Sequence, residues 1–295
     1  MHDSDVAAAL ALGAALFIAV GDVCQQRSAH EVTDEPVGHV ALMLRLLRDQ
    51  RWWVGSVLAT AGFGLQAAAL GFGSVLLVQA LLVTSMLFAL PLSARFSGRP
   101  ITRSQLVWAL ALTIAIAVVV TVGDPAAGQS RASTQTWAWV AAILGTALAL
   151  CLLAARILAE RPAAAVLLGL VSGSLWGVFA VLTKGIVDGL DRGMGAMLTM
   201  PETYGWAAVG VVATTLQQSA FRAGTMAASL PAVAVSEPLV GSVLGVTVLG
   251  EEFRPGRSGW VGLVLAVAVM VVATAVLARS QASAESASPD AVHAK

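Results

Sequence analysis

The residue in this sequence best placed to carry chemistry is Glu237, an acidic side chain well inside a long apolar block. It lies nine residues into the apolar segment 228–249, which at 1.5 Å per helical residue places it about 13 Å deep, near the middle of a bilayer. A carboxyl group at that depth is costly and by default marks a proton, cation or substrate site facing a bundle interior. The structural alternative is a neutral acid bonded to the Ala234 carbonyl, which Pro238 leaves without its helical donor.

Several residues lie at a depth or on a face that lets them act with Glu237. Gly241 and Gly245 follow it at i+4 and i+8, so the three share one helix face, where the glycines favour close packing over a substrate groove. Gln217 and Gln218 lie at nearly the same depth on the preceding segment. One of these two must face inward, and we predict a substrate-binding role for the pair.

Arg222, near the turn of this hairpin, is a candidate charge partner for Glu237 or for an anionic substrate. An arginine this close to a helix end also snorkels readily to the membrane interface. In the first half of the chain, Gln66 and Gln79 lie at matching depths on neighbouring segments. They predict either a hydrogen bond between helices or a polar pair facing the substrate.

Two charged residues and one tryptophan complete the candidate site. Asp22 is either a second protonatable or cation-binding group or a solvated helix end, and Asp22 and Glu237 are the metal candidates if the site takes a cation. Lys184 occupies a position roughly equivalent to that of Asp22 and is either a second charge partner or an interface lysine. Trp176 lies in mid-segment beside glycines at four-residue spacing, which allows it to line a cavity.

Signals for an enzyme are absent from the sequence. It contains no HExxH, GxSxG, P-loop or GxGxxG motif in a suitable context. All four histidines lie outside the apolar segments, and both cysteines lie within apolar blocks, where a small buried thiol is ordinary. We therefore expect no enzymatic activity and no cofactor.

The composition indicates a membrane protein. The chain has 295 residues, of which 58% are hydrophobic and 12% charged, against about 25% charged in a soluble domain. Lys+Arg and Asp+Glu are both 17, so net charge gives no reason to expect a nucleic-acid partner. The apolar residues come in blocks of about 20, the length that crosses a bilayer. Membrane lipid is the expected surrounding partner, and a homodimer is left open.

The blocks predict an all-α polytopic bundle of about nine transmembrane helices. They are 5–26, 51–71, 74–96, 104–123, 137–158, 163–184, 204–224, 228–249 and 259–279. The stretches 37–50 and 188–200 are short and charged, which favours interfacial helices, although the sequence leaves open whether they enter the membrane. The last residues, 280–295, are rich in Ala and Ser and predict a disordered tail.

The distribution of basic residues predicts the orientation. With nine spans, 12 of the 17 Lys and Arg residues fall on the side that carries the C-terminus. The positive-inside rule then places the C-terminus in the cytoplasm and the N-terminus outside, for a multi-pass protein of the cell membrane.

An internal repeat divides the chain. Ser74 lies 25 residues before Arg99-Pro100, and Ser229 lies 25 before Arg254-Pro255, each across one long apolar helix and a basic loop. The plan is a four-helix repeat over 1–123, a loop and connecting helix over 124–162, and a second repeat over 163–279. A single connecting helix inverts the second copy, as in many transporters.

Segments of both halves resemble the drug/metabolite transporter superfamily of the EamA-like type. The resemblance lies in QALLVTSMLFALPLSARFSGRPITRSQ, GSLWGVFAVLTKG and AASLPAVAVSEPLVGSVLGVTVLGEEF, including Lys184, Glu237-Pro238 and Gly250-Glu251. Nine spans and the run RWWVGSVLATAGFGLQAAALGFGSVLLVQAL are similar to the NIPA-like branch, which implies magnesium transport. The first half lacks the Gly-Glu pair, so the repeats differ there.

These observations predict a secondary transporter that moves a small solute or ion by alternating access. The resemblance implies a magnesium or other divalent-cation transporter as the first alternative. Mg²⁺ prefers several oxygen ligands, however, and the spans offer few carboxylates. A lipid flippase or a non-transporting membrane partner is the second alternative.

Overall fold

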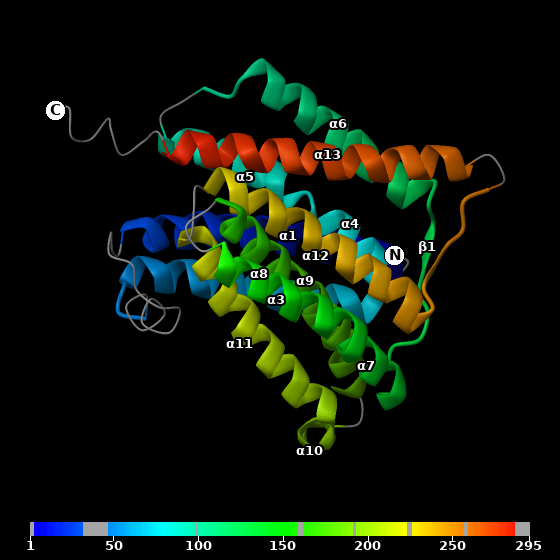
Figure 1. Cartoon of the computed structure of the whole chain (residues 1–295). Helices are drawn as coiled ribbons and strands as arrows, with labels where there is room; N and C mark the ends of the chain where they lie inside the picture. Colours follow the sequence, from blue (N-terminus) through cyan, green and yellow to red (C-terminus); the bar gives the residue numbers. More distant parts are fainter. Residues whose placement is uncertain are drawn as a thin grey trace.

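The chain folds almost entirely into helices, which pack as a bundle in which most run antiparallel to their neighbours along the chain (Figure 1). The structure is a computed structural model, and it describes residues 3–31, 47–97, 100–158, 162–190, 193–222, 226–256 and 259–286. Within these ranges the strands are β1 (Pro125–Ala126) and β2 (Glu252–Phe253), which pair antiparallel. The predicted all-α class is confirmed.

The helices of the first repeat follow the predicted apolar blocks closely. They are α1 (Asp3–Glu31), α3 (Gln50–Phe72), α4 (Val75–Leu82), α5 (Ser85–Ser97) and α6 (Arg103–Thr121). Of the predicted interfacial stretch 37–50, residues 37–46 lie outside the described part of the chain.

The connecting helix and the second repeat complete the bundle. They comprise α7 (Thr134–Val140), the π-helical turn η1 (Ala141–Gly145), α8 (Thr146–Ile157), α9 (Pro162–Gly189), α10 (Met194–Thr199), α11 (Pro201–Arg222), α12 (Met226–Leu249) and α13 (Gly259–Ser286). Within the stretch 188–200 the structure thus forms the six-residue helix α10. Helix α13 continues to Ser286, into the stretch 280–295 for which a disordered tail is predicted; residues 287–295 lie outside the described chain.

Eight helical segments of the described chain are long and apolar enough to cross a membrane. They correspond to eight of the nine predicted spans, and the protein is a polytopic α-helical membrane protein. The remaining predicted span, 204–224, is α11, whose polar residues keep it out of that group. In Figure 1, α11 nevertheless runs from α10 back toward the start of α12, alongside the other helices.

The third predicted span is broken in the structure. The helix stops at Leu82 and resumes at Ser85, and the Thr84 hydroxyl donates a 2.6 Å hydrogen bond to the Leu81 carbonyl. A Thr side chain that bonds to nearby backbone competes with the helical ladder, which accounts for the interruption. The corresponding helix of the second half, α12, stays continuous although it contains Pro231 and Pro238.

Glycines bring α9 and α12 into close contact. A Cβ added at Gly177 would lie 2.7 Å from the Gly241 amide nitrogen and 2.8 Å from the Glu237 carbonyl oxygen. A Cβ at Gly173 would likewise overlap Ser236 and the Val233 carbonyl. Small residues let helix backbones approach in this way in membrane bundles. The α9 glycines therefore set how close α12, and with it Glu237, lies to the bundle centre.

Candidate functional site

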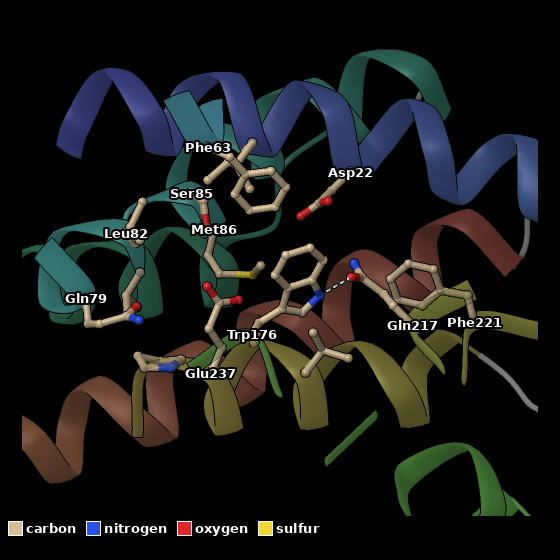
Figure 2. A pocket seen from close by; sticks show the side chains of 15 residues that line it. Asp22, Phe63, Gln79, Leu82, Ser85, Met86, Trp176, Gln217, Phe221 and Glu237 are labelled. Atoms are coloured by element: carbon tan, nitrogen blue, oxygen red, sulfur yellow. Dashed lines mark hydrogen bonds between the residues drawn. The ribbon is translucent and has the colours of Figure 1, made fainter. Parts of the chain in front are cut away.

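A polar cavity lies in the middle of the bundle, where α12 faces α1, α3, α4, α5, α9 and α11 (Figure 2). Its volume is about 70 Å³, room for several water molecules or a compact solute group. We call this space the polar cavity. Its lining side chains are Ile18, Asp22, Phe63, Gln79, Leu82, Val83, Ser85, Met86, Trp176, Gln217, Phe221, Val233, Ala234, Glu237 and Pro238.

The two carboxyl groups of the polar cavity come from different halves of the chain. Asp22 lies on α1 and Glu237 on α12, and both point toward the cavity in Figure 2. Among the described residues, neither side chain has a hydrogen bond or salt bridge to another protein group. Asp22 is well within its helix, because α1 continues to Glu31 rather than ending at residue 26. Two carboxyl groups without protein partners give the cavity acidic character.

Aromatic rings form one wall of the polar cavity. Trp176 stacks on Phe63 with ring centroids 4.8 Å apart and planes inclined by 17°. Its indole Nε1–H donates a 2.6 Å hydrogen bond to Gln217 Oε1, which fixes both side chains (Figure 2). Faces of Trp and Phe attract cations. Trp176 and Gln217 thus both line the cavity, and their role in substrate binding stays a prediction.

Gln79 is a fully buried side chain of the cavity with no protein partner at either its Oε1 or its Nε2 atom within the described structure. It packs on Gly241, where an added Cβ would come within 2.5 Å of its Nε2 atom. A buried amide left unpaired costs free energy, so a bound ligand or water that pairs with it is favoured. Gln66 is also buried but does not line the cavity, so the predicted hydrogen-bonded or substrate-facing pair with Gln79 does not form.

The structure separates the two glutamines of α11. Gln217 faces the polar cavity, whereas Gln218 turns to α1 and donates a 2.9 Å hydrogen bond from Nε2 to Gln25 Oε1. Adjacent helical residues differ by about 100° in direction, and of the two glutamines only Gln217 lines the cavity. The side chain of Arg222, the candidate charge partner, lies outside the described part of the structure.

Lys184 lies in a second polar cluster, at the end of the bundle. Its Nζ atom donates to the Leu70 and Gly73 carbonyl oxygens and lies 3.8 Å from Glu251 Oε1. It is buried and does not snorkel to the interface, and it does not line the polar cavity. Its predicted role as a charge partner at the site is therefore corrected: its partner is Glu251.

Glu251 completes this cluster by capping α4. Its two carboxylate oxygens accept hydrogen bonds from the Val75 and Leu76 amides at 2.7 and 2.9 Å, while the Ser74 hydroxyl accepts one from Leu77 at 3.0 Å. The first amides of α4, which have no partner inside the helix, are satisfied in this way. We call Lys184, Glu251 and these amides the Glu251 cluster.

Two glycines, Gly245 within α12 and Gly250 directly after it, make room for Glu251. Gly250 adopts φ +66°, the left-handed conformation in which glycine commonly ends a helix. At Gly245 an added Cβ would come within 2.9 Å of Glu251 Oε2. Burial raises the pKa of the Glu251 carboxyl above its ordinary value, against the opposing effects of the two amides and of Lys184.

Other cavity residues escaped the sequence reasoning. Phe63, Ser85 and Met86 lie among apolar or small residues, and Glu251 follows a helix end, where an exposed loop position is the ordinary expectation. Of these residues, only Glu251 is indicated by the sequence, through the Gly250-Glu251 pair of the family resemblance. Chemically, the polar cavity offers carboxyl and amide oxygens and aromatic faces, and no Lys or Arg lines its described walls. It is therefore suited to a positively charged group.

Comparison with known proteins gives one curated relative. The chain is 36% identical over 283 residues to an uncharacterized protein of Corynebacterium glutamicum, and the match covers 95% of this chain and 97% of the relative. No protein-family model matches the sequence. No solved structure matches it either.

Proposed function

We propose, from the premise that this chain belongs to the same family as the uncharacterized Corynebacterium glutamicum protein, that it is a secondary transporter working by alternating access. It moves a small solute or ion, and Glu237 is the binding or coupling carboxylate. The multi-pass bundle provides the path, and the predicted inverted repeats provide the two halves that rock against each other.

One observation carries this proposal: two carboxyl groups that have no hydrogen-bond or ion-pair partner among the described residues face a single cavity in a membrane bundle. An ionisable residue inside a membrane is rare and marks substrate or ion pathways and proton relays. Asp22 comes from the first repeat and Glu237 from the second, so a ligand bound between them contacts both halves. A change in the relative position of the halves then alters its binding, as alternating access requires.

The resemblance to EamA-like drug/metabolite transporters supports the same class, and its NIPA-like features support a divalent cation as the alternative substrate. Mg²⁺ is commonly held by one or two carboxylates and retains several waters. Asp22 and Glu237 supply two carboxylates, and the cavity has room for a few waters. We favour a small solute or monovalent ion, because aromatic walls suit an organic cation better than a strongly hydrated metal.

The test is a ligand screen followed by a flux assay. Purified protein is heated with metabolites, drugs, monovalent cations and Mg²⁺, since a ligand of the folded state raises the apparent Tm. Each ligand that raises the Tm is then tested for transport in proteoliposomes that carry the natural protein, Glu237→Gln or Glu252→Gln. Glu252 lies on the exposed strand β2 and is the matched control.

We expect flux and its pH dependence to be lost in Glu237→Gln and kept in Glu252→Gln. Full transport with unchanged pH dependence in Glu237→Gln would show that the mechanism is wrong. If Mg²⁺ alone raises the Tm and is transported, the divalent-cation alternative is correct.

A further inference from the structure

An apolar groove adjoins the polar cavity. The groove runs between α4, α12 and α13, has a volume of about 320 Å³ and is several times larger than the cavity. Its walls include Leu76, Leu239, Val246 and Met270. Its threonines Thr247 and Thr274 donate to carbonyls of their own helices at 2.7 Å, so they offer the groove no free hydroxyl donor. We call this space the apolar groove.

The two spaces share one wall. Val83, Ala234 and Pro238 line both the polar cavity and the apolar groove. Val83 lies at the break between α4 and α5, and Pro238 directly follows Glu237 on α12. These three residues separate the two spaces, so a ligand with its charged end at Glu237 and its other end in the groove would pass between them.

A second apolar groove, of about 360 Å³, has no wall in common with the polar cavity. It lies between the connecting helix α7–α8, α9 and α11, and it shares no lining residue with the polar cavity. It also contains Glu202, which is already paired with Arg131. Of the two grooves, only the one beside α12 adjoins the unpaired carboxyl groups.

From this geometry we propose that the substrate is an amphipathic cation, with a compact charged head in the polar cavity and an apolar chain in the apolar groove. This inference rests on the proposed function. The carboxyl groups of Asp22 and Glu237 attract the head by charge. The ring faces of Phe63 and Trp176 attract it as well, and the Gln79 side chain adds an unpaired amide. The groove faces the outside of the bundle at Leu239 and Val243, so the chain enters sideways from the lipid.

The test uses alkyltrimethylammonium ions of two lengths. Purified full-length protein in neutral maltoside micelles is titrated with tetramethylammonium, with decyltrimethylammonium and with decyl sulfate, which has the same chain but a negative head. Binding is followed by the shift in Tm. Val246→Trp fills the apolar groove, and Val264→Trp is the matched control on an exposed face of α13 outside it.

We expect both cations to bind, and decyl sulfate not to bind. Val246→Trp should weaken decyltrimethylammonium about tenfold or more, because displacing a few buried methylenes is enough for that factor. It should leave the affinity for tetramethylammonium unchanged, and Val264→Trp should change the affinity for neither cation. Glu237→Gln should weaken both cations.

Crosslinking locates the alkyl chain of the bound ligand directly. Decyltrimethylammonium with a diazirine at its tail end should label α12 and α13, at residues such as Leu239 and Met270. Labelling of α8 or α11 instead, equal weakening of both cations by Val246→Trp, or binding of decyl sulfate would overturn the amphipathic substrate. Those results leave the transporter proposal standing, whereas transport that is unchanged in Glu237→Gln contradicts the transporter mechanism itself.

Discussion

Glu237 and Glu251 are both acidic residues of the α12 region, yet their surroundings differ in every respect that matters for function. Glu251 is fully buried and accepts two backbone hydrogen bonds beside Lys184. Glu237 has no described protein partner and faces the polar cavity. A carboxylate whose bonds are all made by protein holds helices together, whereas one whose bonds are left open is free for a ligand. Burial alone therefore does not distinguish a structural acid from a binding acid.

The largest expected effect separates the two acids by stability. Glu251→Ala leaves two amides of α4 without partners and removes the carboxylate that faces the buried Lys184, and we expect the free energy of unfolding to fall by about 3–5 kcal/mol. Glu237→Ala removes no hydrogen bond or salt bridge to a described residue and should change stability by less than about 1 kcal/mol. Unfolding titrations in mixed micelles measure both. Equal losses of unfolding free energy in the two variants would contradict a structural role for Glu251 and a ligand-binding role for Glu237.

A smaller effect tests how the polar cavity is held open. Gly177→Ala places a methyl group against backbone atoms of Glu237 and Gly241, and we expect a loss of about 1–3 kcal/mol from overpacking. Because α12 must shift, ligand-induced stabilisation should also decrease. The control is Gly64→Ala, where the new methyl group meets no atom within 4 Å. If Gly177→Ala keeps full ligand stabilisation, the position of α12 does not control the site.

The smallest effect concerns a third acid, Glu202, in the first turn of α11 ahead of the predicted span. Its Oε1 atom accepts a 2.7 Å hydrogen bond from Arg131, and both side chains are partly exposed. Burial raises the pKa of Glu202, but the hydrogen bond from Arg131, a backbone hydrogen bond and the charge of Arg131 together outweigh it, so the pKa lies below its ordinary value.

A lowered pKa means that Glu202 stabilises the fold above its unfolded pKa. This stabilisation is lost as the pH falls through the folded pKa. The loss should be about 1 kcal/mol or less, because the pair is near the surface. Arg131→Gln should remove that part of the acid dependence of Tm and leave ligand binding unchanged. An acid dependence equal to that of the natural protein would show that the pair contributes nothing.

The helices were predictable because the apolar blocks have the length of a bilayer and are separated by charged loops. The break after Leu82 was not, since Thr84 and Ser85 are small residues within an apolar run and indicate an interruption only weakly. At the site, polarity within a span identified Glu237, Gln79 and Gln217. It gave depth but not direction, so Gln218 and Lys184, chosen by the same rule, point elsewhere.

Glu251 was missed as a site residue for a different reason. A position just after a helix is ordinarily exposed. Glu251 is buried because it contacts the start of α4, which belongs to the other half of the chain. Similarly, the predicted span 5–26 puts Asp22 near a helix end, whereas α1 extends to Glu31. The burial of Glu251 depends on a contact between distant segments, which no local pattern encodes.

The capping of α4 by Glu251 also bears on how the protein is made. The carboxylate and the Val75 amide that it satisfies are 176 residues apart in the chain. During synthesis the first repeat is complete long before Glu251 is available, because domains emerge from the N-terminal end first. The start of α4 must therefore remain open to water or to the insertion machinery until most of the second repeat has been synthesised. Maturation of the first half is thereby coupled to the arrival of the second.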